Sequence, residues 1–169
     1  IDLIDPSMLV EEQEDPRYKD SPFRHIKKML PKQKGKRYEL ITADVYSKLG
    51  YTVTKPENTD HDRIINDIKV EVKGSTDNKG KDFFSFLQIR PAQDYAKGAF
   101  AMFYPQELVI MELTKDQVKQ AIKDGHMKKQ HGGNKAESGT FCYYGNRETL
   151  AALGAIELDR KSTRLNSSH

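Results

Sequence analysis

Two acidic residues and a lysine in the stretch HDRIINDIKVEVKGS have types and spacing that could support phosphate chemistry. The Asn-Asp pair in the middle is a good two-residue turn between two strand-like runs. With that turn, Ile65 is expected opposite Ile68 and Asp62 opposite Glu71. Side chains alternate between the faces of a strand, so Lys73 is expected on the same face as the two acids.

Directly opposed carboxylates destabilise a sheet, because their Cβ atoms lie only ~4.5–5.5 Å apart. A divalent cation between Asp62 and Glu71 removes that cost, and Mg²⁺ accepts one or two protein carboxylates together with waters. The ammonium of Lys73 can orient a water or stabilise negative charge on a phosphate. The three residues therefore predict a metal site for attack on a phosphate.

The opposite face of the same hairpin is apolar. Its side chains are all aliphatic: Ile65, Ile68, Val70 and Val72. We expect this face to belong to the core, which leaves the charged face for chemistry.

The elements around the hairpin alternate between helix and strand. Apolar residues three or four apart predict a helix over residues 36–49 that ends at Gly50. Thr114 and Gln117 form a capping box, which predicts a helix to about Lys123. Further strands are predicted at 51–55, 83–90, 99–105, 108–113 and 140–144, with a helical turn at 91–98 and a last helix at 147–153. This order favours a mixed sheet with helices on both faces.

The composition limits the class of protein. The chain has 169 residues, of which 36% are hydrophobic and 31% charged, which suits one polar globular domain. No apolar run approaches the ~20 residues that a membrane helix needs, so no membrane partner is expected. Cys142 is the only cysteine, which excludes an intramolecular disulfide and a cysteine-based zinc site. It is compatible with a reducing compartment, and we predict a cytoplasmic location.

The two ends of the chain are expected to lie outside the folded domain. Residues 1–35 are acidic and then basic, with four prolines, and predict an extended N-terminal arm with a short helix around SPFRHIKKML, residues 21–30. The chain starts with Ile rather than Met, so we expect this arm to be truncated. Residues 160–169, RKSTRLNSSH, have no apolar period and are expected to be a non-native tail. The catalytic domain is therefore expected at 36–159.

Asp62 and the triplet EVK, residues 71–73, resemble the PD-(D/E)xK nuclease superfamily, and the continuation IRPAQDY resembles its type II restriction endonucleases. The resemblance covers roughly residues 36–114, and His61 replaces the usual proline. It implies an α/β fold with a restriction-endonuclease-like core, a central mixed β-sheet of four to five strands flanked by helices. It also implies Mg²⁺-dependent hydrolysis of DNA phosphodiesters, with Mn²⁺ as a substitute metal.

The resemblance also assigns roles to residues of this chain. Asp62, Glu71 and the backbone carbonyl of Val72 match the metal ligands, Lys73 matches the catalytic lysine, and the remaining candidates are the helix acid Glu39 and the strand glutamine Gln88. Plainer interpretations stay open. Glu71 and Lys73 could form a solvent-facing strand edge, Glu39 could pair with a lysine, and Gln88 could face water.

Double-stranded DNA is the expected partner, and cutting both strands predicts a homodimer. Arg90 and Gln93 are candidates for contacts to base edges, because their side chains can form bidentate hydrogen bonds. The loop after residue 125 supplies the other candidates: Lys128, Lys129, His131 and Lys135. Restriction biology implies a cognate methyltransferase, although no residue here shows one.

Two further hypotheses remain. A repair or recombination nuclease, such as a junction resolvase, would use the same metal site on branched DNA. An inactive DNA-binding module would keep the fold without the chemistry. The aromatic residues of FFSFL, AFAMFYP and TFCYY are predicted to pack in the core rather than to stack on bases.

Overall fold

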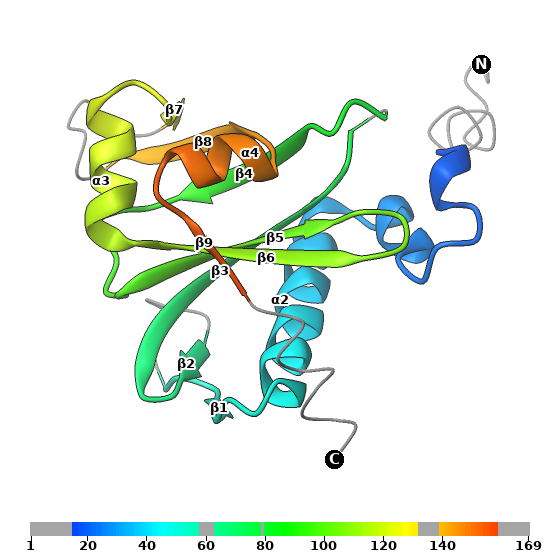
Figure 1. Ribbon diagram of the computed structural model, residues 1–169, viewed down its shortest axis with the longest axis horizontal. Helices are drawn as coiled ribbons and strands as arrows, with labels where there is room; N and C mark the ends of the chain where they lie inside the picture. The colour runs from blue at the N-terminus through cyan, green and yellow to red at the C-terminus, as the bar shows by residue number, and fades with distance from the viewer. Residues whose placement is uncertain (1–14, 58–62, 79, 132–138, 159–169) are drawn as a thin grey trace, which may run out of the picture.

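The computed structural model describes residues 15–57, 63–78, 80–131 and 139–158 of the chain (Figure 1). Its main layer is a six-stranded sheet in the order β1-β2-β3-β5-β6-β9. β3 pairs in parallel with β5, and the other neighbours in that order are antiparallel, so the sheet is mixed. Its strands are β1 (Val53–Thr54), β2 (Arg63–Ile65), β3 (Ile68–Thr76), β5 (Lys97–Phe103), β6 (Leu108–Thr114) and β9 (Ile156–Glu157).

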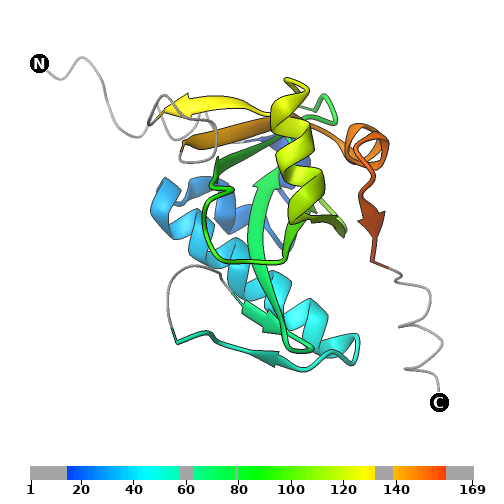
Figure 2. The same cartoon turned by 90° about the vertical axis from the view of Figure 1, so that its left-hand side faces the viewer.

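A second, smaller sheet lies over one face of the main sheet (Figures 1 and 2). Its three strands follow the order β4-β8-β7, with β4 (Phe84–Ile89), β8 (Thr140–Gly145) and β7 (Lys128–His131). The buried side chains Phe84 and Phe86 of β4 join Phe100 of the main sheet in one apolar cluster. The Phe86 ring meets the Phe100 ring edge to face, with centroids 5.1 Å apart, so β4 stacks over the main sheet rather than extending it.

The predicted α/β class, with a mixed sheet flanked by helices, is confirmed. The predicted strand number is wrong, since the central sheet has six strands and β4 belongs to the second sheet. The predicted helical turn at 91–98 is also wrong: residues 91–96 form turns and bends, and β5 begins at Lys97. The resemblance to a restriction-endonuclease-like core stays a prediction.

Helices cover both faces of the main sheet (Figure 2). On one face, the long helix α2 (Pro31–Lys48) packs Tyr38 and Tyr46 against β3 and β5. On the other, α3 (Lys115–Lys123) and α4 (Arg147–Ala152) contribute Val118 and Leu150 to the cluster that the small sheet covers. Both predicted helix starts are confirmed, with capping boxes at Thr114 and Asn146.

Helix α2 starts at Pro31, earlier than the predicted residue 36, because proline is well suited to the first turn of a helix. The described part of the predicted arm also forms two short 3₁₀-helices, η1 (Pro16–Tyr18) and η2 (Arg24–Lys28). Tyr18 and Ile26 are buried, so this part of the arm packs against the domain. Residues 1–14 and the predicted tail at 160–169 lie outside the described residues.

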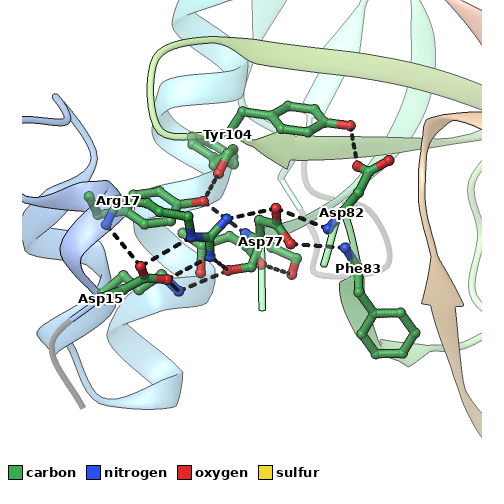
Figure 3. A network of polar contacts seen from close by, with 11 residues as sticks. Asp15, Arg17, Asp77, Asp82, Phe83 and Tyr104 are labelled. Carbon is green, nitrogen blue, oxygen red and sulfur yellow. Dashed lines mark hydrogen bonds and ion pairs between the residues drawn. The ribbon is translucent and has the colours of Figure 1, made fainter. Parts of the chain in front are cut away.

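A network of ion pairs joins η1 to the end of β3 (Figure 3). The buried carboxylate of Asp77 accepts hydrogen bonds from the backbone N–H groups of Asp82 and Phe83 and from the Arg17 guanidinium. Arg17 also donates to Asp15, whose second cationic partner is Lys27 at 3.2 Å. The network therefore fixes both the arm and the loop that leads into β4.

We expect this network to make the stability of the protein depend on acidic pH. Burial raises the pKa of Asp15, but hydrogen bonds from Arg17 and Lys27 outweigh that effect and lower the pKa to about 2, below its ordinary value of 3.8. The ionised Asp15 carboxylate stabilises the folded state fully above pH 3.8, the pKa of the unfolded chain. This stabilisation is lost as the pH falls through the folded-state pKa of about 2. Wild type should lose about 2 kcal/mol more unfolding free energy than Asp15→Asn between pH 5 and pH 2, measured by urea unfolding. Equal losses of unfolding free energy in wild type and Asp15→Asn would contradict this role of the Asp15 ion pairs.

Candidate active site

The hairpin of β2 and β3 has the predicted register. Ile65 pairs with Ile68, and Arg63 pairs with Val70. The turn residues Asn66 and Asp67 have φ angles of 49° and 67°. Two consecutive positive values are typical of the type I′ turn, whose twist matches that of the flanking strands. The turn prediction is therefore confirmed.

The two faces of β3 also divide as predicted. Ile65, Val70 and Val72 belong to the apolar cluster beneath α2. Ile68, at the turn, is partly exposed. Glu71 and Lys73 alternate with the valines and therefore point to the opposite face, where the small sheet and α3 lie.

Glu71 is a buried carboxylate on an interior strand, with only 6% of its surface exposed. The Nζ atom of Lys73 lies 3.9 Å from Glu71 Oε2, which is an ion pair beyond hydrogen-bond range. A solvent-facing strand edge would expose the carboxylate, so this plainer interpretation does not describe Glu71. Asp62 lies outside the described residues, and its position opposite Glu71 stays a prediction.

The connection between β4 and β5 runs across the same end of β3 and is held there by several contacts. The N–H group of Ala96 donates to the carbonyl of Lys69, and the Lys69 ammonium pairs with Asp94. From α3, Lys115 donates to the carbonyl of Gln93, and its Nζ atom lies 4.5 Å from the centre of the Tyr95 ring. The contacts fix residues 93–96 as a strap beside the charged face.

Within this strap, Tyr95 interacts electrostatically with Glu71 of the candidate site. Its side chain is buried, and burial raises the pKa of its phenol, with a further increase from the Glu71 carboxylate. The phenol therefore stays protonated in neutral solution. Sequence reasoning missed Tyr95, because nothing in PAQDYAKG indicates that its ring folds back toward β3.

Glu39 pairs with an arginine rather than with a lysine. Its carboxylate accepts a hydrogen bond from the guanidinium of Arg63, which is itself buried. Arg63 pairs with Val70 across the hairpin and therefore lies on the α2 side of the sheet. A catalytic role for Glu39 stays a prediction.

Gln88 lies in the small sheet at a bulge between Phe86 and Ile89, with a φ angle of 57°. Its side chain is exposed, and its Oε1 atom accepts a hydrogen bond of 2.9 Å from Arg90. Its backbone N–H donates to Oε1 of Gln130 in β7. The structure thus joins two residues that the sequence assigned to different roles, the metal site and DNA contact.

The remaining candidates for DNA contact lie on different elements. Gln93 is part of the strap, whereas Lys128 and Lys129 lie in β7. The sequence predicted a loop from residue 126 onward that contains these lysines. This prediction is wrong for residues 128–131, which form a strand that pairs with β8. The backbone of His131 pairs with Thr140, and Lys135 lies outside the described residues.

Among the described residues, no group of three or more His, Cys, Asp or Glu side chains is arranged to hold a metal ion. Glu71 is the predicted carboxylate ligand that lies within the described residues, and the contribution of Asp62 and of the Val72 carbonyl stays a prediction. Within the same ranges, no helix combines the length and the apolar character needed to cross a bilayer.

Comparison with known proteins finds no matching family model and no matching curated protein. Among solved structures, the chain is similar to a bacterial homing endonuclease, I-Ssp6803I, with 15% sequence identity and a TM-score of 0.44. The alignment covers 70% of this chain and 76% of that protein. At this level of similarity, function has to be inferred from the chain's own residues.

Proposed function

We propose that this protein is a Mg²⁺-dependent DNA endonuclease whose site lies on the Glu71 and Lys73 face of β3. One observation carries the proposal: a buried carboxylate and an ammonium lie 3.9 Å apart on one face of a hairpin strand. Burying a carboxylate is costly unless charge or hydrogen bonds compensate for it. The Lys73 ammonium supplies part of that compensation as an ion pair with Glu71.

The proposed donors are suited to magnesium. Glu71 supplies a carboxylate, and the sequence adds Asp62 and the Val72 carbonyl, so all donors are oxygen atoms, which Mg²⁺ prefers over nitrogen and sulfur. Mn²⁺ accepts the same donors and is the proposed substitute. A bound Mg²⁺ would neutralise charge on the phosphate and lower the pKa of a coordinated water.

Lys73 and Tyr95 complete the proposed site. The ammonium of Lys73 would orient the attacking water or stabilise the negative charge that develops on the phosphate. The protonated phenol of Tyr95 adds no charge beside Glu71. Gln88, bound to Arg90, is proposed as a supporting residue. Glu39 pairs with Arg63 on the α2 side of the sheet, so its proposed support is indirect, through the hairpin that carries Glu71.

Double-stranded DNA is the proposed substrate, cut at specific sites by a homodimer. Arg90 and Gln93 would read base edges, since both lie in the connection that leaves β4 beside the site. The basic residues of β7 and of the loop after it would contact phosphates: Lys128, Lys129, His131 and Lys135.

The experiment that tests this function compares two substrates. Purified protein is incubated with a long plain duplex and with a four-way junction, each in Mg²⁺ and in EDTA, and the products are separated on a gel. We expect discrete fragments from the duplex in Mg²⁺ and intact DNA in EDTA. Cleavage confined to the junction would indicate a resolvase instead. Intact DNA in every lane would contradict the proposal.

A further inference from the structure

The small sheet has a second face, which points away from the main sheet. Phe84, Phe86 and Tyr143 are buried in the apolar cluster between the sheets. Because side chains alternate, their neighbours in β4 and β8 point outward. Ser85 pairs directly with Tyr144 and Lys128 with Cys142, so these pairs share a face. We call it the outer face, formed by Phe83, Ser85, Leu87, Lys128, Cys142 and Tyr144.

The outer face exposes large apolar side chains. Phe83 is 41% exposed, Leu87 44% and Tyr144 49%. The rings of Phe83 and Tyr144 are nearly parallel, with an interplanar angle of 6° and centroids 5.9 Å apart. Figure 3 shows the Phe83 ring turned away from the polar network of Asp77. The sequence predicted both rings to be core packing, which is wrong for these two residues.

Basic side chains border the aromatic pair. Lys128 is exposed in the edge strand β7, and Lys81 is exposed two residues ahead of Phe83. The nearby acid, Asp82, accepts a hydrogen bond of 2.8 Å from the hydroxyl of Tyr104 and points toward that side (Figure 3). The outer face therefore combines flat apolar rings with positive charge.

We propose that the outer face binds single-stranded nucleic acid. Bases would stack on Phe83 and Tyr144, and phosphates would contact Lys81 and Lys128. Stacking on aromatic rings together with basic side chains along the backbone is how sheet surfaces bind single strands without sequence preference. A duplex keeps its bases paired and stacked, so it cannot offer them to these rings. The two rings lie apart from the proposed cleavage site on β3, and Lys128 is shared with the proposed phosphate contacts of the duplex.

The test measures binding in EDTA, so that its result does not depend on cleavage. Anisotropy of a labelled oligothymidylate is compared with that of a labelled duplex of equal length. We expect the wild type to bind the single strand, and the ring substitutions to weaken that binding while leaving duplex binding unchanged. The double variant Phe83→Leu/Tyr144→Leu should bind the single strand at least about fivefold more weakly, since leucine keeps the apolar area but removes the flat ring. Tyr144→Phe, which keeps the ring, should bind like the wild type.

Matched controls separate stacking from general charge and from folding. Leu40→Ala removes an exposed apolar side chain from α2 and should not change binding. Lys128→Gln should weaken binding and reduce its salt dependence, whereas Lys119→Gln on α3 should not. Circular dichroism checks that each variant is folded.

Several outcomes would overturn the inference. These are wild-type affinity for the single strand in the double leucine variant, or no single-strand binding by the wild type. Light scattering measures whether the protein is a dimer. A dimer that persists in the double leucine variant but is lost in Phe83→Ser/Tyr144→Ser would identify a second copy of the chain as the occupant instead. Failure to cleave DNA in Mg²⁺ would contradict the proposed function but would leave this inference standing.

Discussion

Replacing Lys73 with methionine is expected to lower the rate of Mg²⁺-dependent DNA cleavage by about 10²- to 10³-fold. The change keeps the length and the apolar part of the side chain but removes the ammonium beside Glu71. Without that charge, negative charge on the phosphate loses its stabilisation in the transition state, while the carboxylates remain. Single-turnover cleavage of a duplex measures the rate, and thermal unfolding checks the fold.

Lys69→Met is the matched control for this prediction. Lys69 lies on the same strand and the same face, but its ammonium pairs with Asp94 near the turn. We expect less than about a threefold change in rate, because exposed ion pairs contribute little. If the two variants lost activity equally, general loss of positive charge on β3 would explain the effect, and the specific role of Lys73 would be wrong.

Gly74→Ala is expected to destabilise the protein by about 1–3 kcal/mol, because it overpacks the contact between β3 and α2. A Cβ atom at this position would lie 2.5 Å from both Cβ and Cγ of Tyr38. Tyr38 cannot move away easily, since its ring packs against Phe103 and its hydroxyl accepts a hydrogen bond from the N–H group of Thr76. Equilibrium urea unfolding measures the change.

Gly35→Ala, in helix α2, has the opposite expected effect on stability. A Cβ atom at Gly35 would meet nothing within 4 Å, and alanine favours a helix over glycine by up to about 1 kcal/mol. This variant should therefore be as stable as the wild type or more stable. Equal destabilisation of both variants would show that the close approach of Tyr38 to β3 is not the cause.

The local features of the site could be predicted from the sequence because short-range chemistry determines them. Asn66 and Asp67 tolerate positive φ angles, so they fix the turn, and the turn fixes the register of the hairpin. The alternation that separates Val70 and Val72 from Glu71 and Lys73 follows directly. The capping box at Thr114 is equally local.

The sequence could not predict the arrangements that depend on distant contacts. β4 alternates like an ordinary strand, and only its pairing with β8 and the packing of Phe86 on Phe100 place it in a second sheet. The same pairing decides which aromatic rings are exposed, so Phe83 and Tyr144 could not be distinguished from their buried neighbours. Tyr95 was missed because Lys115, from a different element, holds the strap in place.

The most direct test of the proposed metal site is the rate of duplex cleavage as a function of Mg²⁺ concentration, for wild type and Lys73→Met in one assay. We expect the wild-type rate to rise to a plateau with Mg²⁺ and to vanish in EDTA. The variant should stay near zero at every concentration. Cleavage that persists in EDTA, or a variant that follows the wild-type curve, would contradict the assignment of the site to Glu71 and Lys73.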